Sequence, residues 1–378
     1  MISIDCQPRR LQRGQTPNSR VGQNAFIFNR DLYIYGGTGG AVGSAVSGNL
    51  YRLNLDDLST GWVEESTISE SASLPAARSG ATTVCVNHYM YLFGGQSGDR
   101  DLQTKSTSMA SHRRETYSDV WRLDLLKLTW RPLLAAPGRN ALGMVPSARR
   151  GHTTCVLGAP GNELLLTFGG EGLERSFCCD TYLNDVWMLN LQKSEWEGFE
   201  IENDHYTEEY QDKYQIPTPR SLHTATAVDT TRVVVYGGIS CSIKASANGP
   251  YIQMQSVGTR SHAKDKIHVL TLSKGKKNSK ICTWSTPVTS GESPGGLYGH
   301  TASLINNGKE KNIIFYGGMP NKKIPHNNIY VLTVADNQKI DNQKDVNEER
   351  AEWNWSFIQV KGFLQTLPPR YDSKIEKN

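Results

Sequence analysis

The stretch RVVVYGGIS, residues 232–240, is a run of four apolar or aromatic β-forming residues followed by a glycine pair. The run predicts a buried strand, yet glycine weakens a strand interior, so a strand that ends on two glycines requires a reason. The same pattern occurs five times, with pairs that end at positions 37, 95, 170, 238 and 318. Separations of 58 to 80 residues indicate a repeated unit whose connections vary in length.

The flanks of the glycine pairs repeat as well. Upstream lies a proline-and-arginine turn followed by an apolar run, as in PSARRGHTTCVL (146–157). Downstream lies an alternating segment, as in DVWRLDL (119–125), and then a tryptophan that opens a short fourth run. Period-two alternation bounded by turn residues is typical of strands. Each unit is therefore predicted to contain four short strands in an antiparallel meander.

A single sheet of this kind cannot bury both of its faces, whereas radial stacking of several sheets can. The sequence therefore predicts an all-β propeller with blades at about 17–74, 75–145, 146–216, 217–292 and 293–366. Glycines, which lack Cβ atoms, would let neighbouring blades approach, and the tryptophans would fill the space between blades. These structural positions are Gly36, Gly37, Gly94, Gly95, Gly169, Gly170, Gly237, Gly238, Gly317, Gly318, Trp62, Trp130, Trp196, Trp284 and Trp353, with Trp355 as the alternative to Trp353.

Taken together, the P-x-x-R-x-G-H turn, the glycine pair, the D-V-W-x-L-x-L strand and the spaced tryptophan resemble the kelch repeat over roughly residues 17–370. The Gly-His pair of that repeat is intact in the third and fifth units and changed in the others, and Leu297 replaces the arginine in the fifth. The changed pairs are Gly22–Gln23, Gly80–Ala81 and Leu222–His223. The resemblance implies a kelch-type β-propeller of four-stranded antiparallel blades, with five complete blades and a partial sixth.

The two ends of the sequence favour an incomplete ring. Residues 1–16 precede the first repeat, and Ile4 lies where the fourth strand of a blade is expected. Residues 367–378 begin like a sixth repeat and then become polar. We expect residues 1–16 to supply a closing strand and the chain to be a truncated six- or seven-bladed ring. A five-bladed closure and completion by segments of a partner are the alternatives.

Composition narrows the class of protein. No stretch approaches 18 uncharged apolar residues, and MISIDCQPRR is not typical of a signal peptide. The seven cysteines show no C-x-x-C spacing, which favours a reducing compartment. We expect a cytoplasmic or nuclear protein with no cofactor, metal or membrane partner. The net charge of +4 does not by itself indicate nucleic-acid binding.

The connections between the second and third strands vary most in length, at 96–118, 239–265 and 319–327. Long loops on a rigid scaffold are the usual place for binding, and a guanidinium group can bind a carboxylate through two hydrogen bonds. The basic candidates are Arg100, Lys105, Arg113, Arg114, Lys244, Arg260, Lys264, Lys322 and Lys323. We hypothesise that this face, formed by the 2–3 and 4–1 loops, binds an acidic or carboxy-terminal peptide. The alternative is that these side chains are only solvated surface charges.

Sequence motifs that would indicate catalysis are weaker than those that indicate the repeat. His152, His223 and His300 share one repeat position, so we expect them to be structural hydrogen-bonding residues. No Ser-His-Asp set, paired carboxylates or clustered metal-ligand spacing stands out. The resemblance implies a protein-interaction scaffold of the substrate-receptor or adaptor type, as in ubiquitin ligases or in cytoskeletal and trafficking complexes. A propeller enzyme, such as a metal-dependent oxidase or lyase, is the alternative.

Overall fold

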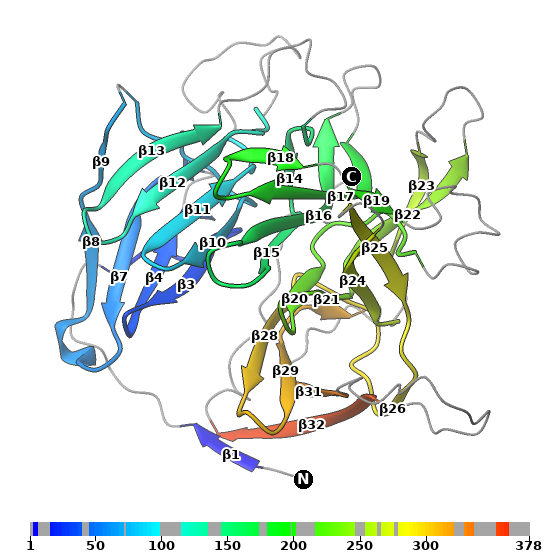
Figure 1. The fold of residues 1–378 in the computed structure, drawn as a ribbon. Helices are drawn as coiled ribbons and strands as arrows, with labels where there is room; N and C mark the ends of the chain where they lie inside the picture. The colour runs from blue at the N-terminus through cyan, green and yellow to red at the C-terminus, as the bar shows by residue number, and fades with distance from the viewer. Residues whose placement is uncertain are drawn as a thin grey trace. The chain divides into compact units, whose positions relative to one another are not determined.

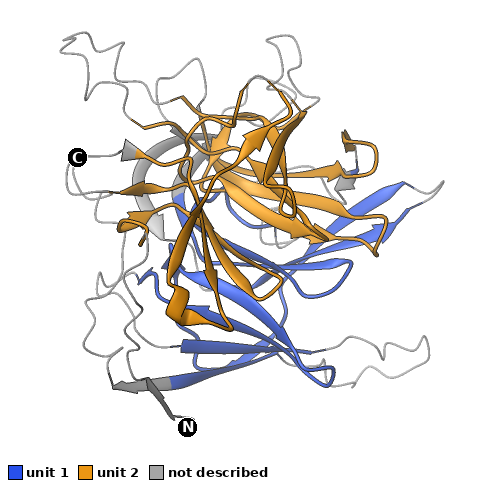
Figure 2. Cartoon of the chain, turned by 90° about the vertical axis from the view of Figure 1, so that its left-hand side faces the viewer, with its two compact units in different colours: residues 1–8, 198–378 blue, residues 9–197 orange. Residues whose placement is uncertain are grey.

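The structure is a computed structural model that describes fourteen segments of the chain. They are residues 3–6, 16–39, 45–71, 73–98, 115–134, 145–173, 180–197, 199–201, 216–245, 254–262, 266–275, 279–320, 329–335 and 353–362. The chain divides into two compact units, shown in Figure 2. The N-terminal unit is Arg9–Glu197, and the C-terminal unit comprises Met1–Pro8 and Gly198–Asn378.

The N-terminal unit contains three four-stranded antiparallel sheets, here called blades 1 to 3 (Figure 1). Blade 1 consists of β3 (Asn24–Phe28), β4 (Asp31–Tyr35), β7 (Leu50–Asn54) and β8 (Trp62–Glu65), with a 3-10 turn at Leu58–Thr60. Blade 2 consists of β10 (Thr82–Val86), β11 (Tyr89–Phe93), β12 (Val120–Asp124) and β13 (Thr129–Leu134). Blade 3 consists of β15 (Thr153–Leu157), β16 (Leu164–Leu173), β17 (Asp180–Asn190) and β18 (Glu195–Glu197).

Short strands add to these blades. A small sheet beside blade 1 joins β2 (Arg20–Val21), β5 (Thr38–Gly39) and β6 (Ala45–Val46). In blade 2, β9 (Ile68–Ser69) pairs in parallel with β13. In blade 3, β14 (Arg149–Arg150) pairs with the far end of β16. The segment that joins blades 1 and 2 is therefore held on the fourth strand of blade 2.

The C-terminal unit contains blades 4 and 5. Blade 4 consists of β20 (Thr224–Ala227), β21 (Arg232–Tyr236), β24 (His268–Lys274) and β25 (Lys280–Ser285), with β19 (Glu200–Ile201) parallel to β25. Blade 5 consists of β28 (Thr301–Asn306), β29 (Lys311–Tyr316), β31 (Ile329–Val334) and β32 (Trp353–Gly362), with β26 (Thr289–Gly291) parallel to β32. A further two-stranded pair joins β27 (Leu297–Tyr298) and β30 (Met319–Pro320). The predicted all-β fold of five four-stranded propeller blades is confirmed.

Period-two alternation explains how one strand serves two cores. On β11, Met90 and Leu92 pack with Tyr35 and Leu50 of blade 1. The alternate residues Tyr91 and Phe93 belong to a second core with Leu165 and Leu189 of blade 3. Because successive side chains point to opposite faces, the middle blade of this unit is apolar on both sides.

Two of the repeated tryptophans, Trp130 and Trp355, belong to the apolar cores and Trp196 packs against one, whereas Trp62 and Trp284 are only partly buried. Trp130 and Trp355 are almost fully buried, and each ring lies about 5 Å from the aromatic residue that precedes the glycine pair of the preceding blade. The register also decides between the two candidates of blade 5. In every blade the tryptophan opposes the first leucine of the L-x-L or L-x-V pattern of the third strand: Leu53–Trp62, Leu123–Trp130, Leu189–Trp196, Leu270–Trp284 and Leu332–Trp355. Trp355 is thus the repeat residue, and Trp353 is a second buried tryptophan beside it.

In blades 1, 2 and 4 the first glycine of the pair closely approaches the next blade, as predicted, whereas a Cβ at Gly317 of blade 5 would meet no described atom within 4 Å. Gly36 and Gly94 have φ values of +72° and +67°, and a Cβ at either position would lie 2.7 Å from the carbonyl oxygen of Arg78 or Arg149 in the next blade. In the C-terminal unit, a Cβ at Gly237 would lie closer still to the carbonyl oxygen of Leu297. Any other residue would therefore meet both a strained backbone and a backbone atom of its neighbour.

Three details differ from the predicted pattern. In blade 3, β16 continues through its glycine pair to Leu173, with a register shift between Phe168 and Gly170. The connection at 239–265 contains a hairpin of β22 (Ile239–Ala245) and β23 (Met254–His262) instead of a simple loop, and this hairpin projects away from β24 and β25 in Figure 1. At the N-terminus, β1 (Ser3–Cys6) pairs in parallel with β32 and so extends blade 5.

The predicted partial sixth repeat at 367–378 lies outside the described residues. The role of residues 1–16 as a closing strand stays a prediction. Within the described segments, the structure has no helix of the length and apolar character that crossing a membrane requires.

Candidate functional site

The predicted basic residues fall mostly outside the described segments. Lys244 and Arg260 lie on β22 and β23 of the projecting hairpin. The structure does not describe the others: Arg100, Lys105, Arg113, Arg114, Lys264, Lys322 and Lys323. The predicted site on the 2–3 loops therefore stays a prediction, and the described chemistry lies at the repeat residues themselves.

The arginine of the P-x-x-R turn is a buried structural residue in blade 2. The side chain of Arg78 is 0% exposed, and its Nε and Nη1 groups donate to the carbonyl oxygens of Ala76 and Gly94 at 2.9 and 3.0 Å. Its Nη1 and Nη2 groups also donate to the two carboxylate oxygens of Asp119 at 2.7 and 3.0 Å. This two-pronged contact neutralises the buried guanidinium charge.

An aromatic ring and an indole complete the arrangement in blade 2. The guanidinium carbon of Arg78 lies 4.3 Å from the centre of the Tyr117 ring. The indole Nε1 of Trp121 donates to Asp119 at 2.6 Å. The D-V-W motif therefore supplies both the counter-charge for the arginine and the group that orients that counter-charge.

Blade 3 repeats the same geometry. Arg149 donates to the Gly169 carbonyl oxygen at 3.0 Å and to both carboxylate oxygens of Asp185 at 2.7 and 2.8 Å. Trp187 donates to Asp185 at 2.6 Å. Burial acts to raise the pKa of Asp185, but the charge of Arg149 and the hydrogen bonds hold that pKa below its usual value. The aspartate is therefore ionised at neutral pH.

The repeated histidines connect neighbouring blades. The Nε2 atom of His152 lies 2.9 Å from the hydroxyl of Thr82, and that of His300 lies 2.9 Å from the hydroxyl of Thr224. Burial lowers the pKa of both histidines to about 3, and for His152 the charge of Arg149 acts in the same direction. Both rings are therefore neutral at physiological pH. These contacts support the structural role predicted for them.

Blade 1 keeps the backbone contacts of the repeat arginine, here called the arginine frame: its hydrogen bonds to two backbone carbonyl oxygens. The Nε and Nη1 groups of Arg20 donate to the carbonyl oxygens of Asn18 and Gly36 at 3.1 and 3.0 Å, as Arg78 does to its own equivalents. The amide of Ser47 donates to Gly37 at 2.9 Å, as that of Tyr117 donates to Gly95 at 2.8 Å. These matching bonds make Ser47 the counterpart of Tyr117, and therefore Asn49 the counterpart of Asp119.

The side chains in blade 1 differ at the positions that surround the guanidinium. Asn49 replaces the aspartate, and its Nδ2 donates to Glu64 at 2.6 Å. Tyr51 replaces the tryptophan, and its ring centre lies 5.1 Å from the guanidinium carbon of Arg20. Within the described part of the chain, the guanidinium of Arg20 donates to the backbone carbonyl oxygens of Asn18 and Gly36, has no carboxylate partner and is only partly buried. Its charge is thus not neutralised by the blade that holds it.

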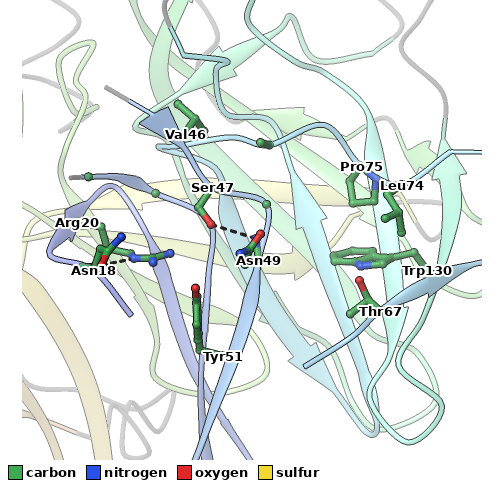
Figure 3. A pocket seen from close by; sticks show the side chains of 14 residues that line it. Asn18, Arg20, Val46, Ser47, Asn49, Tyr51, Thr67, Leu74, Pro75 and Trp130 are labelled. Atoms are coloured by element: carbon green, nitrogen blue, oxygen red, sulfur yellow. Dashed lines mark hydrogen bonds between the residues drawn. The ribbon is translucent and has the colours of Figure 1, made fainter. Parts of the chain in front are cut away.

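A cavity of about 530 Å³ opens beside Arg20, a volume typical of small ligand pockets. Figure 3 shows Arg20 and Asn18 at one side, and Trp130, Leu74 and Pro75 at the other. Most of the lining comes from the 2–3 connection of blade 1 and from the segment that joins blades 1 and 2. Among the described residues that line the cavity, Arg20 is the one charged residue. The cavity therefore combines a cation with an apolar wall.

This cavity was missed from the sequence, although a signal for it is present. The segment NLYRLNL (49–55) carries asparagine where DVWRLDL and DVWMLNL carry aspartate. That difference has meaning only once the aspartate is known to bind the repeat arginine. Elsewhere, the described residues contain no cluster of three or more histidine, cysteine, aspartate or glutamate side chains placed to hold a metal ion.

Comparison with known proteins identifies the family. The family model described as the KLHDC2/KLHL20/DRC7 Kelch-repeats domain matches residues 6–238, which is more than half of the chain. The chain belongs to this kelch-repeat family. The paired glycines, the buried arginines and the tryptophans of this kelch-repeat protein are therefore the residues of its repeat.

The curated relatives are distant and longer. Kelch domain-containing protein 10 of Xenopus laevis is 27% identical over 227 residues, which are 60% of this chain and 45% of that protein. Kelch domain-containing protein 1 of Homo sapiens is 26% identical over 238 residues, 61% of this chain and 52% of that protein. F-box/kelch-repeat protein At1g51550 of Arabidopsis thaliana is 26% identical over 231 residues, 59% and 39% respectively. The matches span about half or less of each relative.

Proposed function

We propose that this kelch-repeat protein is a non-catalytic module that binds a segment of another protein on the face formed by its 2–3 and 4–1 connections. The observation that supports this most is the Arg20 cavity, whose lining comes mainly from those two kinds of connection. The basic 2–3 connections predicted from the sequence would add positive charge around it. An acidic or carboxy-terminal peptide is the ligand chemistry that suits such a surface.

The use of the other repeat residues supports a binding role over a catalytic one. Arg78 and Arg149 are buried against aspartates, and His152 and His300 are buried against threonines. These groups hold the blades together and are not presented to a substrate. One relative is named an F-box/kelch-repeat protein, and by analogy we extend the proposal to a substrate-receptor or adaptor role.

A peptide selection tests the proposal. Random peptides displayed on phage, with free and with blocked carboxy termini, are selected on the purified chain. We expect acidic sequences to be enriched, and their affinity to fall at least about tenfold in a variant with alanine at Arg113, Arg114, Arg260, Lys322 and Lys323, because interfacial charges steer and hold an oppositely charged peptide. Failure to enrich any peptide would refute the binding role.

A matched variant controls for the loss of positive charge. It carries alanine at five basic residues at or beside the 1–2 and 3–4 turns, which lie at the opposite ends of the strands: Arg30, Lys127, Lys193, Lys274 and Lys309. This variant should keep its affinity for the selected peptides. If both variants lose affinity equally, the binding surface is not on the 2–3 and 4–1 face.

Metal analysis of the purified protein separates the proposal from an oxidase or lyase. We expect no stoichiometric copper or iron. A bound redox metal at one equivalent would favour the enzyme.

A further inference from the structure

Blade 1 holds its repeat arginine on the same kind of backbone contacts as blades 2 and 3, but among the described residues no carboxylate pairs with it. In blades 2 and 3, a carboxylate of the same chain takes two hydrogen bonds from the guanidinium. In blade 1, the corresponding residue is Asn49, and its amide is directed to Glu64. We propose that the missing carboxylate is supplied in trans, by an aspartate or glutamate side chain of a partner protein that enters the Arg20 cavity.

The geometry of the frame shows which group is missing. The Nε and Nη1 groups of Arg20 donate to the carbonyl oxygens of Asn18 and Gly36, which are the equivalents in blade 1 of the oxygens that Arg78 contacts in blade 2. These contacts fix the plane of the guanidinium. In blade 2 the Nη1 and Nη2 groups of Arg78 donate to Asp119, and the corresponding position in blade 1 carries no carboxylate. A planar guanidinium held in this way is pre-organised for two-pronged binding.

Space for the incoming group comes from two substitutions. Ser47 stands where blade 2 has Tyr117 over the guanidinium, and Asn49 stands where blade 2 has Asp119. The smaller serine leaves the guanidinium open on that side, and the cavity of about 530 Å³ lies there. In blade 2 the corresponding guanidinium is covered by Tyr117 and paired with Asp119.

The cavity wall specifies more than a carboxylate. Across from Arg20, Trp130, Leu74 and Pro75 form an apolar wall (Figure 3). Tyr51 lies under the guanidinium and adds a further aromatic surface. An acidic residue followed by an apolar residue would place its carboxylate on Arg20 and its neighbour on this wall. The occupant is therefore an internal acidic-apolar pair of a partner peptide.

This inference deepens the proposed function, since the cavity lies on the proposed binding face, but its test does not depend on finding the natural partner. Three dipeptides are titrated into the full chain and followed by NMR of the arginine Nε–H groups and by tryptophan fluorescence. They are acetyl-Glu-Leu-amide, its neutral analogue acetyl-Gln-Leu-amide, and acetyl-Gln-Leu with a free carboxy terminus. We expect the glutamate probe to bind at least about tenfold more tightly than the neutral one, because hydrogen bonds to charged groups are the stronger class.

Restoring the carboxylate in cis provides the decisive variant. Asn49→Asp combined with Glu64→Gln supplies an internal partner for Arg20 without placing two carboxylates side by side. Binding of the glutamate probe should fall at least tenfold in this double variant and stay unchanged in Glu64→Gln alone. Both variants keep Arg20, so neither removes a group from the fold's own arginine frame.

Three results would overturn the proposal. One is equal binding of the glutamate and glutamine probes, and another is unchanged binding in the double variant. The third is preference for the probe with the free carboxy terminus, which would assign the cavity to chain ends instead of acidic side chains. The wider proposed function fails separately: a chain that binds the glutamate probe but enriches no peptide on phage retains the Arg20 site and loses the peptide-binding role.

Discussion

Blades 1 and 2 each hold the arginine of the P-x-x-R turn on two equivalent backbone carbonyl oxygens, but only blade 2 supplies a counter-charge for it. Arg78 is fully buried and paired with Asp119. Arg20 is partly exposed, lies over Tyr51 and borders a cavity. The backbone of the repeat is thus retained while the side chains at positions 47, 49 and 51 differ from their counterparts in blade 2.

This comparison separates two uses of one repeat position. In blade 2 the arginine ties the P-x-x-R turn to the third strand and to the glycine pair. In blade 1 the arginine keeps its hydrogen bond to the carbonyl oxygen of the glycine pair. It has no ion pair with the third strand, where Asn49 donates to Glu64 instead. A position whose structural bond is removed can acquire a binding role without any change of fold, because the remaining contacts still orient the side chain.

The largest expected effect comes from breaking the pair in blade 2. Replacing Asp119 by alanine leaves the guanidinium of Arg78 buried without a counter-charge. We expect a loss of about 3–5 kcal/mol in the free energy of unfolding, the usual cost of removing one partner of a buried ion pair. Urea denaturation of the full chain measures this loss.

The matched change in blade 1 should be mild. Asn49→Ala removes one hydrogen bond to the exposed Glu64, so we expect a change within about 1 kcal/mol. Equal losses in the two variants would mean that Asn49 and Asp119 hold their blades in the same way. The contrast between the two blades would then be wrong.

The next effect is the pH dependence of the free energy of unfolding that arises from the repeat histidines, His152 and His300. His152 and His300 have pKa values of about 3 in the folded chain, whereas an unfolded histidine has a pKa near 6.5. Below about pH 6.5 the unfolded chain binds protons that the folded chain excludes, so stability falls as the pH falls. Each histidine should contribute about 1.4 kcal/mol per pH unit once the pH is well below 6.5.

Urea midpoints between pH 7 and pH 5 measure this dependence. Blades 1 and 2 have Gln23 and Ala81 at the histidine position, so they contribute no such term. Replacing His152 by glutamine should therefore flatten the pH dependence by the contribution of one proton. An unchanged slope in that variant would show that His152 binds protons equally in the folded and unfolded chains, so that burial does not lower its pKa. His88→Gln, in the turn between β10 and β11, is the control.

The double variant Asn49→Asp with Glu64→Gln should convert blade 1 towards blade 2. We expect the free energy of unfolding to rise by about 1 kcal/mol relative to Glu64→Gln alone, because the new carboxylate can accept charged hydrogen bonds from Arg20. Thermal and urea unfolding of the two variants measure the difference. No gain in stability would mean that the guanidinium of Arg20 is already satisfied.

Much of the blade structure was predictable because its signals are local. Alternating residues, glycine pairs and turn prolines lie within a few positions of each other, and they predicted the four strands of every blade. The parallel pairings of β9, β19 and β26 were not predictable, because strands of two or three residues have no periodicity. The choice between Trp353 and Trp355 required the register with Leu332.

The candidate site was less predictable, because its contacts join distant positions. Arg20 and Asn49 are far apart in the sequence, and the contact that joins this pair of positions is seen in blades 2 and 3. Composition drew attention to basic residues on long connections, most of which lie outside the described segments. An unpartnered repeat arginine is found by comparing blades position by position, after the structure of one blade is known.

Blade 4 carries Leu222 at the position before the repeat histidine, where the other four blades carry glycine, and the expected effect of changing it is among the smallest. This leucine has a φ value of +55°, close to the +60° to +65° of Gly22, Gly80, Gly151 and Gly299 at the same repeat position. Its carbonyl oxygen accepts a hydrogen bond from Gly299 at 2.9 Å, as that of Gly80 does from Gly151. A side chain in this backbone region costs of order 1 kcal/mol, so the fold holds Leu222 against its preference.

Comparing glycine with alanine at this position isolates the backbone contribution. Both Leu222→Gly and Leu222→Ala lose most of the half-buried side chain, but only glycine relieves the strained φ. We expect the glycine variant to be more stable than the alanine variant by about 1 kcal/mol in urea unfolding. At Ala225 in β20, where φ is not positive, replacement by glycine should instead lower stability by about 0.5–1 kcal/mol. If alanine proved as stable as glycine at position 222, the repeat would not require a positive φ there, and the shared backbone frame would extend to fewer positions than blades 1 and 2 indicate.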